Sequence, residues 1–148
     1  MTKLVLLVED NASDEKLTLL ALKKCKIENE VAVARDGAEA LDFLFATGSH
    51  ATRDAAHLPT LVLLDLKLPK IDGLEVLRRI RADDRTRDLP VVVLTSSRQD
   101  EDLTQGYAFG ANAYVRKPVD YGEFVEAART LGIFWLSVNE VPPPKVIR

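Results

Sequence analysis

The sequence predicts an α/β protein: a flavodoxin-like, doubly wound (βα)5 sandwich built on a five-stranded parallel sheet. Three observations predict it. Short apolar runs alternate with amphipathic helical patterns, several apolar runs end in polar residues, and the 148 residues suit one domain with a sizeable core. The connections are short, so right-handed crossovers are expected. The flavodoxin-like strand order then places the first strand beside the third.

The expected strands are short apolar segments, which are typical of a buried parallel sheet. They occupy residues 4–8, 30–34, 60–65, 91–94 and 113–116. The first strand runs into Glu9 and Asp10, the third ends at Asp65, and the fourth leads to Thr95. The fifth delivers Lys117. Parallel strands end at one edge of their sheet, so these side chains are expected to gather there.

Helical patterns fill the segments between these strands, with apolar residues at helical spacing. Four of the helix starts are marked by Asn11 or Ser13, the turn Asp36-Gly37, the pair Asp72-Gly73, and Asp120. The remaining helix is expected from Gln99 to Phe109, with Gly110 at its C-cap position.

The acidic edge predicts metal and phosphoryl chemistry. Closely packed carboxylates repel each other unless a cation neutralises them, and hard oxygen ligands favour Mg²⁺. Asp65 is then a candidate nucleophile toward a phosphoryl donor. Thr95 can donate a hydrogen bond to a phosphoryl oxygen, and Lys117 adds a positive charge. Both isomers of the Lys117-Pro118 peptide bond stay open, and a cis bond would direct the amine toward the site.

Each of these acids alone is more commonly a helix cap or a solvated loop residue. The combination of three acids, a hydroxyl and an amine on separate strands favours the chemical interpretation. His50 and His57 lie in the polar loop of residues 47–59 without ligand partners nearby in sequence. We expect both to be exposed and inert.

Composition excludes several classes of protein. Twenty Lys and Arg residues against 23 Asp and Glu residues give a net charge of -3, which disfavours a general nucleic-acid surface. No apolar stretch is long enough to cross a membrane. Cys25 is the only cysteine, so an internal disulfide is impossible. A cytoplasmic protein is expected.

Four motifs together resemble the receiver domain of two-component response regulators. They are Val8-Glu9-Asp10-Asn11, the segment from Leu64 to Gly73, Leu94-Thr95-Ser96, and the segment from Gly110 to Pro118. The resemblance spans about residues 3–131. It divides the chain into a receiver domain, residues 1–131, and a C-terminal extension of the fifth helix with a Pro-rich tail, residues 132–148.

The resemblance implies a role for each matching residue. Asp65 matches the phosphoacceptor, and Lys117 matches the family's site lysine. Thr95 and Tyr114 match the switch hydroxyl and the switch aromatic. The implied Mg²⁺ ligands are Asp65, Asp10 directly, Glu9 through water, and the backbone carbonyl of Lys67.

The long loop of residues 47–59 and the continuation past residue 131 are similar to the single-domain regulators that serve bacterial phytochromes. The resemblance therefore implies a sensor histidine kinase as phosphoryl donor, with a bacteriophytochrome as the finer expectation. No DNA-binding output domain is expected, and signalling would pass through protein contacts. The chain would catalyse only its own phosphorylation and slow dephosphorylation. Relay of the group to a histidine phosphotransfer protein stays open.

Two other classes of protein share part of this chemistry. A haloacid-dehalogenase-type phosphatase also uses a strand-end Asp and Mg²⁺, but it needs a second Asp two residues later, where this chain has Lys67. A flavodoxin-type flavin binder needs a hydroxyl- and Gly-rich phosphate loop after the first strand. Here Glu9, Asp10 and Asn11 would repel a phosphate that lacked a metal.

The C-terminal extension predicts association. Phe124, Ala128, Leu131, Trp135 and Val138 follow helical spacing. Trp135 and Val138 are expected to project beyond the domain's own core, with apolar neighbours that include Phe134. A homodimer with Phe134, Trp135 and Val138 at its interface is the expectation. A helix break at Gly132, and a tail that folds back over its own domain, are the alternatives.

Overall fold

The computed structural model describes residues 2–143. Its centre is a parallel sheet in the order β2-β1-β3-β4-β5. The strands are β1 (Lys3–Val8), β2 (Asn29–Ala34), β3 (Leu61–Leu64), β4 (Val91–Thr95) and β5 (Ala113–Arg116). This order confirms the predicted flavodoxin-like fold, with the first and third strands side by side.

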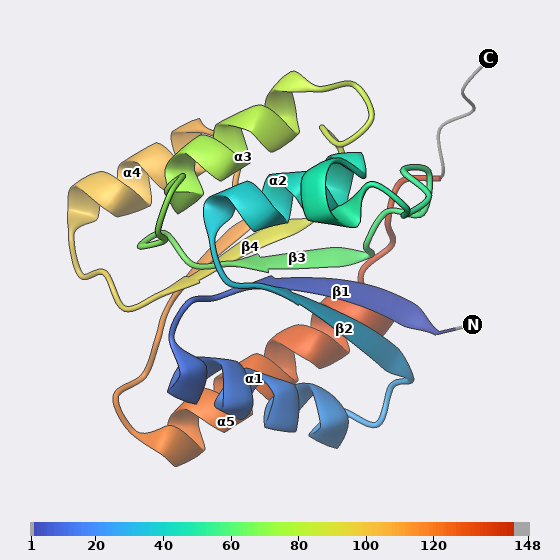
Figure 1. Ribbon diagram of the computed structural model, residues 1–148. Coiled ribbons are helices and arrows are strands. Elements are labelled where there is room, and N and C mark those ends of the chain that lie inside the picture. Colours follow the sequence, from blue (N-terminus) through green and yellow to red (C-terminus); the bar gives the residue numbers. More distant parts are fainter. Residues whose placement is uncertain (1, 144–148) are drawn as a thin grey trace.

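Five helices cover the two faces of the sheet. They are α1 (Ala12–Lys24), α2 (Gly37–Phe45), α3 (Gly73–Ala82), α4 (Asp100–Ala108) and α5 (Tyr121–Ile133). Figure 1 shows α1 and α5 on one face and α2, α3 and α4 on the other. Within residues 2–143, no helix is long and apolar enough to span a membrane.

The central strands are buried on both faces, which explains why their sequences read as continuous apolar runs. All four residues of β3 and all five of β4 are buried. Val8 of β1 pairs with Leu64 of β3, and Leu64 in turn pairs with Val93 of β4. This register brings the C-terminal ends of the three strands to the same edge of the sheet.

Short polar side chains start four of the helices. Asn11, Asp36, Asp72 and Asp120 each accept a hydrogen bond from the backbone N–H three residues later. These bonds satisfy N–H groups that have no partner inside the helix. Of the two candidate caps for α1, Asn11 is the one observed, and Ser13 lies inside the helix.

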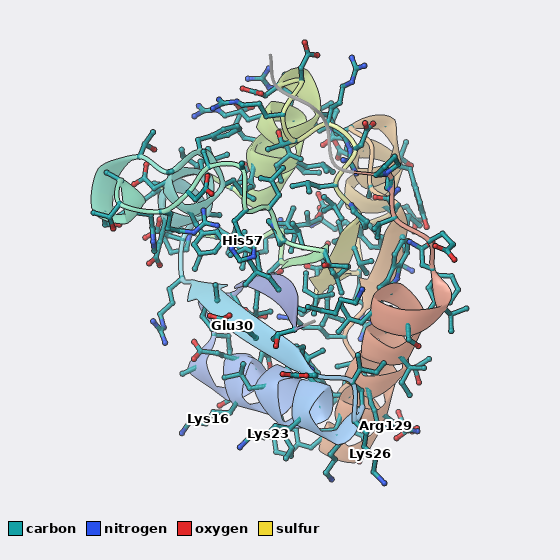
Figure 2. The ribbon with its side chains drawn as sticks, turned by 90° about the vertical axis from the view of Figure 1, so that its right-hand side faces the viewer. Lys16, Lys23, Lys26, Glu30, His57 and Arg129 are labelled. Atoms are coloured by element: carbon teal, nitrogen blue, oxygen red, sulfur yellow. The ribbon has the colours of Figure 1, made fainter. Side chains whose placement is uncertain are left out.

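The loop between α2 and β3 is held against α2 and includes a short 3-10 turn, Gly48–His50. The Arg53 guanidinium donates to the carbonyl oxygens of Phe43 and His57. The His50 ring contacts the Phe43 ring edge-on, and its Nε2 lies 3.3 Å from a Glu39 carboxylate oxygen. The expectation that His50 is exposed without a partner is therefore wrong. His57 is exposed, and in Figure 2 it lies near the middle of the view, above Glu30 of β2.

Helix α5 continues past Gly132 instead of breaking there. A Cβ on Gly132 would lie 3.0 Å from Cδ2 of Leu22 in α1 and 3.5 Å from the sulfur of Cys25, the residue that follows α1. The glycine therefore allows a close approach of α5 to α1. This packing explains why the helix keeps a residue of low helical propensity.

A π-helical turn, Phe134–Val138, continues α5 and packs against the domain. Leu136 is buried in the core cluster between the sheet and α1, and Trp135 packs partly buried against the same cluster. The expectation that Trp135 projects beyond the domain's own core is therefore wrong. Phe134 and Val138 are exposed, as expected. Residues 144–148 of the predicted Pro-rich tail lie outside the described residues.

Leu136→Ala tests the packing of this turn. A buried Leu that becomes Ala loses apolar burial and leaves a cavity, so we expect the free energy of unfolding to fall by about 2–4 kcal/mol. Val138→Ala in the same turn should change it by less than about 0.5 kcal/mol, because Val138 is 62% exposed. Urea denaturation measures both values. Equal effects of the two substitutions would contradict the observed packing.

Candidate functional site

The site is built by the ends of β1 and β3. The Glu9 N–H donates to the Ala34 carbonyl at 2.9 Å, and the Asp65 N–H donates to the Val8 carbonyl at 3.1 Å. These bonds extend the parallel ladder one residue past each strand. Glu9 and Asp65 therefore leave the sheet at its C-terminal edge, where the strands end on the left of Figure 1.

Three carboxylates meet at this edge. Glu9, Asp10 and Asp65 each offer an oxygen, and these oxygens lie within 4.8 Å of one another. Glu9 and Asp65 are buried, whereas Asp10 is exposed. Burial raises the pKa of Glu9 to about 7, and the nearby Asp65 adds to the shift. Oxygen ligands at this spacing, with one of them open to solvent, fit a hard divalent cation.

The Asp65 carboxylate is held on both of its oxygens. Oδ1 accepts from the backbone N–H of Leu66 at 2.7 Å and of Lys67 at 3.4 Å. Oδ2 accepts from Lys117 Nζ at 2.9 Å. The start of α3 lies against the same residue, since a Cβ on Gly73 would be 2.2 Å from the Asp65 carbonyl oxygen. Only glycine fits at that position without moving backbone.

Lys117 is buried among carboxylates. Its Nζ donates to Glu9 Oε1 at 2.6 Å, to Asp14 Oδ2 at 2.8 Å and to Asp65 Oδ2 at 2.9 Å. Burial alone would lower the pKa of Lys117, but Asp65, Asp14 and Glu9 together raise it above its usual value. Residues 2–143 contain no cis peptide bond, so the amine reaches the site with a trans Lys117-Pro118 bond.

Asp14 is a site residue that sequence analysis missed. An acid in the first turn of a helix is ordinarily explained by the helix dipole, and that explanation gives no reason to connect it with Lys117. Its position in the sequence could have indicated the site, because Asp14 lies four residues after Asp10. The first turn of α1, which contains Asp14, begins shortly after the end of β1. The contact joins residues 103 positions apart in sequence.

Thr95 lies fully buried at the end of β4, and its Oγ1 accepts from the Ser97 N–H at 3.3 Å. Ser97 Oγ donates to the buried Asp102 carboxylate at 2.6 Å. Lys67 Nζ lies 3.4 Å from the same carboxylate. Neither Ser97 nor Asp102 was expected from the sequence. They connect the loop after Asp65 with the start of α4.

Tyr114 projects from β5 beneath α4. A Cβ on Gly106 would lie 3.0 Å from its ring, so this glycine leaves room for the aromatic side chain. The Tyr114 hydroxyl is buried and has no hydrogen-bond partner among residues 2–143. Burial, followed by the charge of Asp102, raises the pKa of Tyr114. The ring therefore occupies an inward position beside the Ser97 and Asp102 pair.

An open depression borders the acidic cluster. Its lining includes Asp10, Lys67, Leu68, Asp72, Leu74 and Asp102. Lys67 thus lines the same depression as Asp10, and the role of its backbone carbonyl as a metal ligand stays a prediction. The site as a whole combines a restrained carboxylate, a cluster suited to a cation, and a buried ammonium. This combination suits the transfer of an anionic group to Asp65.

The sequence model of the response regulator receiver domain matches residues 5–129. Response regulator Rcp1 from Synechocystis sp. is 36% identical over 140 residues, which cover 95% of this chain and 93% of Rcp1. A solved Mn²⁺-bound form of response regulator Rcp1 superposes with a TM-score of 0.89 at 35% identity, covering 95% of this chain and 99% of that one.

Two further solved structures are similar over nearly the whole chain. The phosphorylated cyanobacterial phytochrome response regulator RcpA gives a TM-score of 0.90 at 36% identity, covering 97% of this chain and 100% of RcpA. The bacteriophytochrome response regulator AtBRR is 54% identical with a TM-score of 0.74, covering 95% of this chain and 99% of AtBRR. Sequence, fold and site geometry agree, and the chain belongs to the response regulator receiver domain family.

Proposed function

We propose that this protein is a single-domain response regulator that accepts a phosphoryl group on Asp65 in a Mg²⁺-dependent reaction. The observation that carries the proposal is the Asp65 carboxylate, which accepts a hydrogen bond from the Lys117 ammonium and clusters with the acidic pair Glu9 and Asp10. The hydrogen bonds to this buried carboxylate fix the position of its nucleophilic oxygen before the phosphoryl donor binds.

In the proposed reaction, an Asp65 oxygen forms a bond to phosphorus while the bond from phosphorus to the donor's histidine nitrogen breaks. The electron pair of that bond leaves with the nitrogen. A bound Mg²⁺ would offset the negative charge of the carboxylates and the phosphoryl oxygens. Asp10, Asp65 and the Lys67 carbonyl would hold the cation, with Glu9 acting through water. Lys117 and Thr95 would donate hydrogen bonds to the phosphoryl oxygens.

We infer a sensor histidine kinase as the donor, and a bacteriophytochrome as the specific partner. Support comes from the relatives, since RcpA is a phytochrome response regulator and AtBRR a bacteriophytochrome response regulator. The protein would act in the cytoplasm, without turnover of any other substrate. Transfer from a purified phytochrome kinase, compared with an unrelated kinase, tests the partner. Equal transfer from both would contradict it.

Asp65→Asn tests the acceptor. The wild-type protein should gain one phosphoryl group from acetyl phosphate and Mg²⁺, as measured by intact mass. Asp65→Asn should gain none, because an amide oxygen is a poor nucleophile. Asp10→Asn should slow the reaction at limiting Mg²⁺, because one cation ligand is weakened.

Two controls belong to this experiment. EDTA should abolish labelling of the wild type, and Asp84→Asn, on the surface after α3, should leave it unchanged. Labelling of the Asp65→Asn variant at the wild-type rate would refute the acceptor, and labelling that EDTA leaves unaffected would refute the metal requirement.

We further propose that Thr95 and Tyr114 carry the signal away from the site. A phosphoryl group that draws the Thr95 hydroxyl acts on Ser97, whose N–H donates to that hydroxyl. Ser97 and its partner Asp102 lie next to the Tyr114 ring. Phosphorylation would then hold the ring in the inward position and reshape the surface of α4, β5 and α5. Such small shifts separate states by a few kcal/mol at most.

Thr95→Ala tests this route. Asp65 should still be phosphorylated, because its nucleophile and cation ligands remain. Backbone amide signals of α4 and β5 in NMR spectra should respond to phosphorylation much less than in the wild type. Thr95→Ser, which keeps the hydroxyl, is the matched control and should respond fully. A full response in the alanine variant would argue against the route.

We also propose a homodimer that uses α5, its π-helical turn, and the neighbouring surface of α4 and β5. Phe134 is 44% exposed and Val138 62% exposed, and a shallow groove along α5 has Val115, Ala127 and Leu131 in its lining, with Glu123, Glu126 and Thr130 beside them. A second copy would cover this surface by two-fold symmetry. Trp135, which packs on its own domain, would support the interface from below.

Phe134→Ser combined with Val138→Ser should shift the protein toward monomer at tens of micromolar, as measured by sedimentation. These side chains are exposed, so the fold should survive, whereas truncation after Leu131 would also remove the buried Leu136. Leu20→Ser is the matched control, because Leu20 is also 44% exposed but lies on α1. A monomeric wild-type protein, phosphorylated or not, would refute the dimer.

A further inference from the structure

Asp14 occupies a place in the site that the acceptor and metal roles leave unexplained. Its Oδ2 accepts from Lys117 Nζ at 2.8 Å, but its carboxylate is not among the three that cluster for a cation. It comes from the first turn of α1, whereas Glu9 and Asp65 come from the ends of strands. The Asp14 carboxylate therefore joins the site by its hydrogen bond from the lysine.

The three carboxylates use the full hydrogen-bonding capacity of Lys117. An ammonium group has three N–H donors and no acceptor. Glu9, Asp14 and Asp65 accept one each, at 2.6, 2.8 and 2.9 Å. Three contacts from three different parts of the chain stabilise the charge of the ammonium and fix the position of its nitrogen. With only two of these contacts, the nitrogen could still move around the line between the two accepting oxygens.

Asp14 is itself held in place by its surroundings. Its backbone N–H donates to the Asn11 side chain at 3.0 Å, and its carbonyl accepts from the buried Thr18 hydroxyl at 2.8 Å. The Asn11 N–H in turn donates to Glu9 Oε2 at 3.2 Å. The cap of α1 therefore ties together two of the three acids that surround Lys117.

We propose that Asp14 is the positioning residue for Lys117. When a phosphoryl group joins Asp65, the N–H that now donates to Asp65 Oδ2 can turn to a phosphoryl oxygen. Glu9 and Asp14 keep the other two N–H groups and hold the nitrogen where that bond forms. This inference rests on the proposed phosphorylation of Asp65.

A competing role for Asp14 is purely electrostatic. Its side chain is 24% exposed and adds negative charge near a site that receives an anion. If charge alone mattered, every substitution that removes the charge would speed phosphorylation by an anionic donor. Positioning predicts the opposite for a substitution that also removes the hydrogen-bond acceptor. The two roles are therefore separated by the sign of the effect.

The first measurement is the rate of phosphorylation by acetyl phosphate at saturating Mg²⁺. Asp14→Ala should slow it about tenfold or more, because a misplaced catalytic group loses most of its benefit. Asp14→Asn should stay within about twofold of the wild type, because its amide oxygen still accepts from Lys117. In a Lys117→Met background, Asp14→Ala should have no further effect. Equal rates for the alanine and asparagine variants, or a faster alanine variant, would overturn the proposal.

Glu15→Ala is the matched control. It removes one negative charge from the same helical turn, but Glu15 pairs with Arg35 and makes no contact with Lys117. Its rate should stay within about twofold of the wild type. If Asp14→Ala does not fold, Asp14→Glu gives the same comparison, because it keeps the charge and displaces the carboxylate by one methylene group. A glutamate variant as fast as the wild type would then overturn positioning.

The second measurement does not require phosphorylation. In protein labelled with ¹⁵N-lysine, the Lys117 ammonium signal should be visible in the wild type and in Asp14→Asn, because its protons are held by buried acceptors. It should broaden in Asp14→Ala. An unchanged signal in Asp14→Ala would overturn the proposal whatever the phosphorylation rates are. A wild type that takes up no phosphoryl group would refute the proposed function instead, and the lysine signal would still decide this inference.

Discussion

The rest of the site depends on the ion pairs between the buried Lys117 ammonium and the carboxylates around it. Glu9 and Asp65 are buried carboxylates, and each would be costly to bury without a paired charge. One ammonium serves both of them and Asp14 as well, through hydrogen bonds of 2.6–2.9 Å. Asp10 lies beside Glu9 and Asp65, and the Lys117 ammonium donates its hydrogen bonds to other carboxylates. The site therefore has more acidic groups than the single ammonium can neutralise. A site with surplus negative charge and one solvent-exposed carboxylate is suited to a divalent cation.

The sheet makes this arrangement possible by bringing together groups that are distant in sequence. Lys117 and Glu9 are 108 residues apart, yet the parallel ladder ends each strand at the same edge. The close approach of α3, which requires Gly73, packs this helix against the backbone carbonyl of Asp65. The same register that buries the apolar strands therefore determines the geometry of the polar edge. A shift of β3 by one residue would turn Asp65 to the opposite face and disperse the site.

Much of this could be predicted from the sequence, because strand ends and helix caps are local signals. Asp65 and Lys117 follow apolar runs, and a sheet edge is the natural place for them. Asp14 could not be assigned in the same way, because its role depends on its contact with Lys117, which is distant in sequence. Trp135 shows a related limit: helical spacing tells which face a residue lies on, but not what covers that face. Propensity alone made Gly132 a candidate break, whereas the close approach of α1 gives it a structural reason to be there.

The connection between the site and α4 passes through side chains that touch both. Lys67 follows Asp65 by two residues, and its Nζ lies 3.4 Å from Asp102 in the first turn of α4. Ser97 joins the same Asp102 to the Thr95 hydroxyl through two hydrogen bonds. The site therefore contacts α4 along two routes, through the loop after β3 and through the loop after β4. Because the Tyr114 ring fills the space beneath Gly106 of α4, a displacement of that helix changes the packing of β5 as well. The surface of α4 and β5 is thus connected to the site by a continuous set of side-chain contacts.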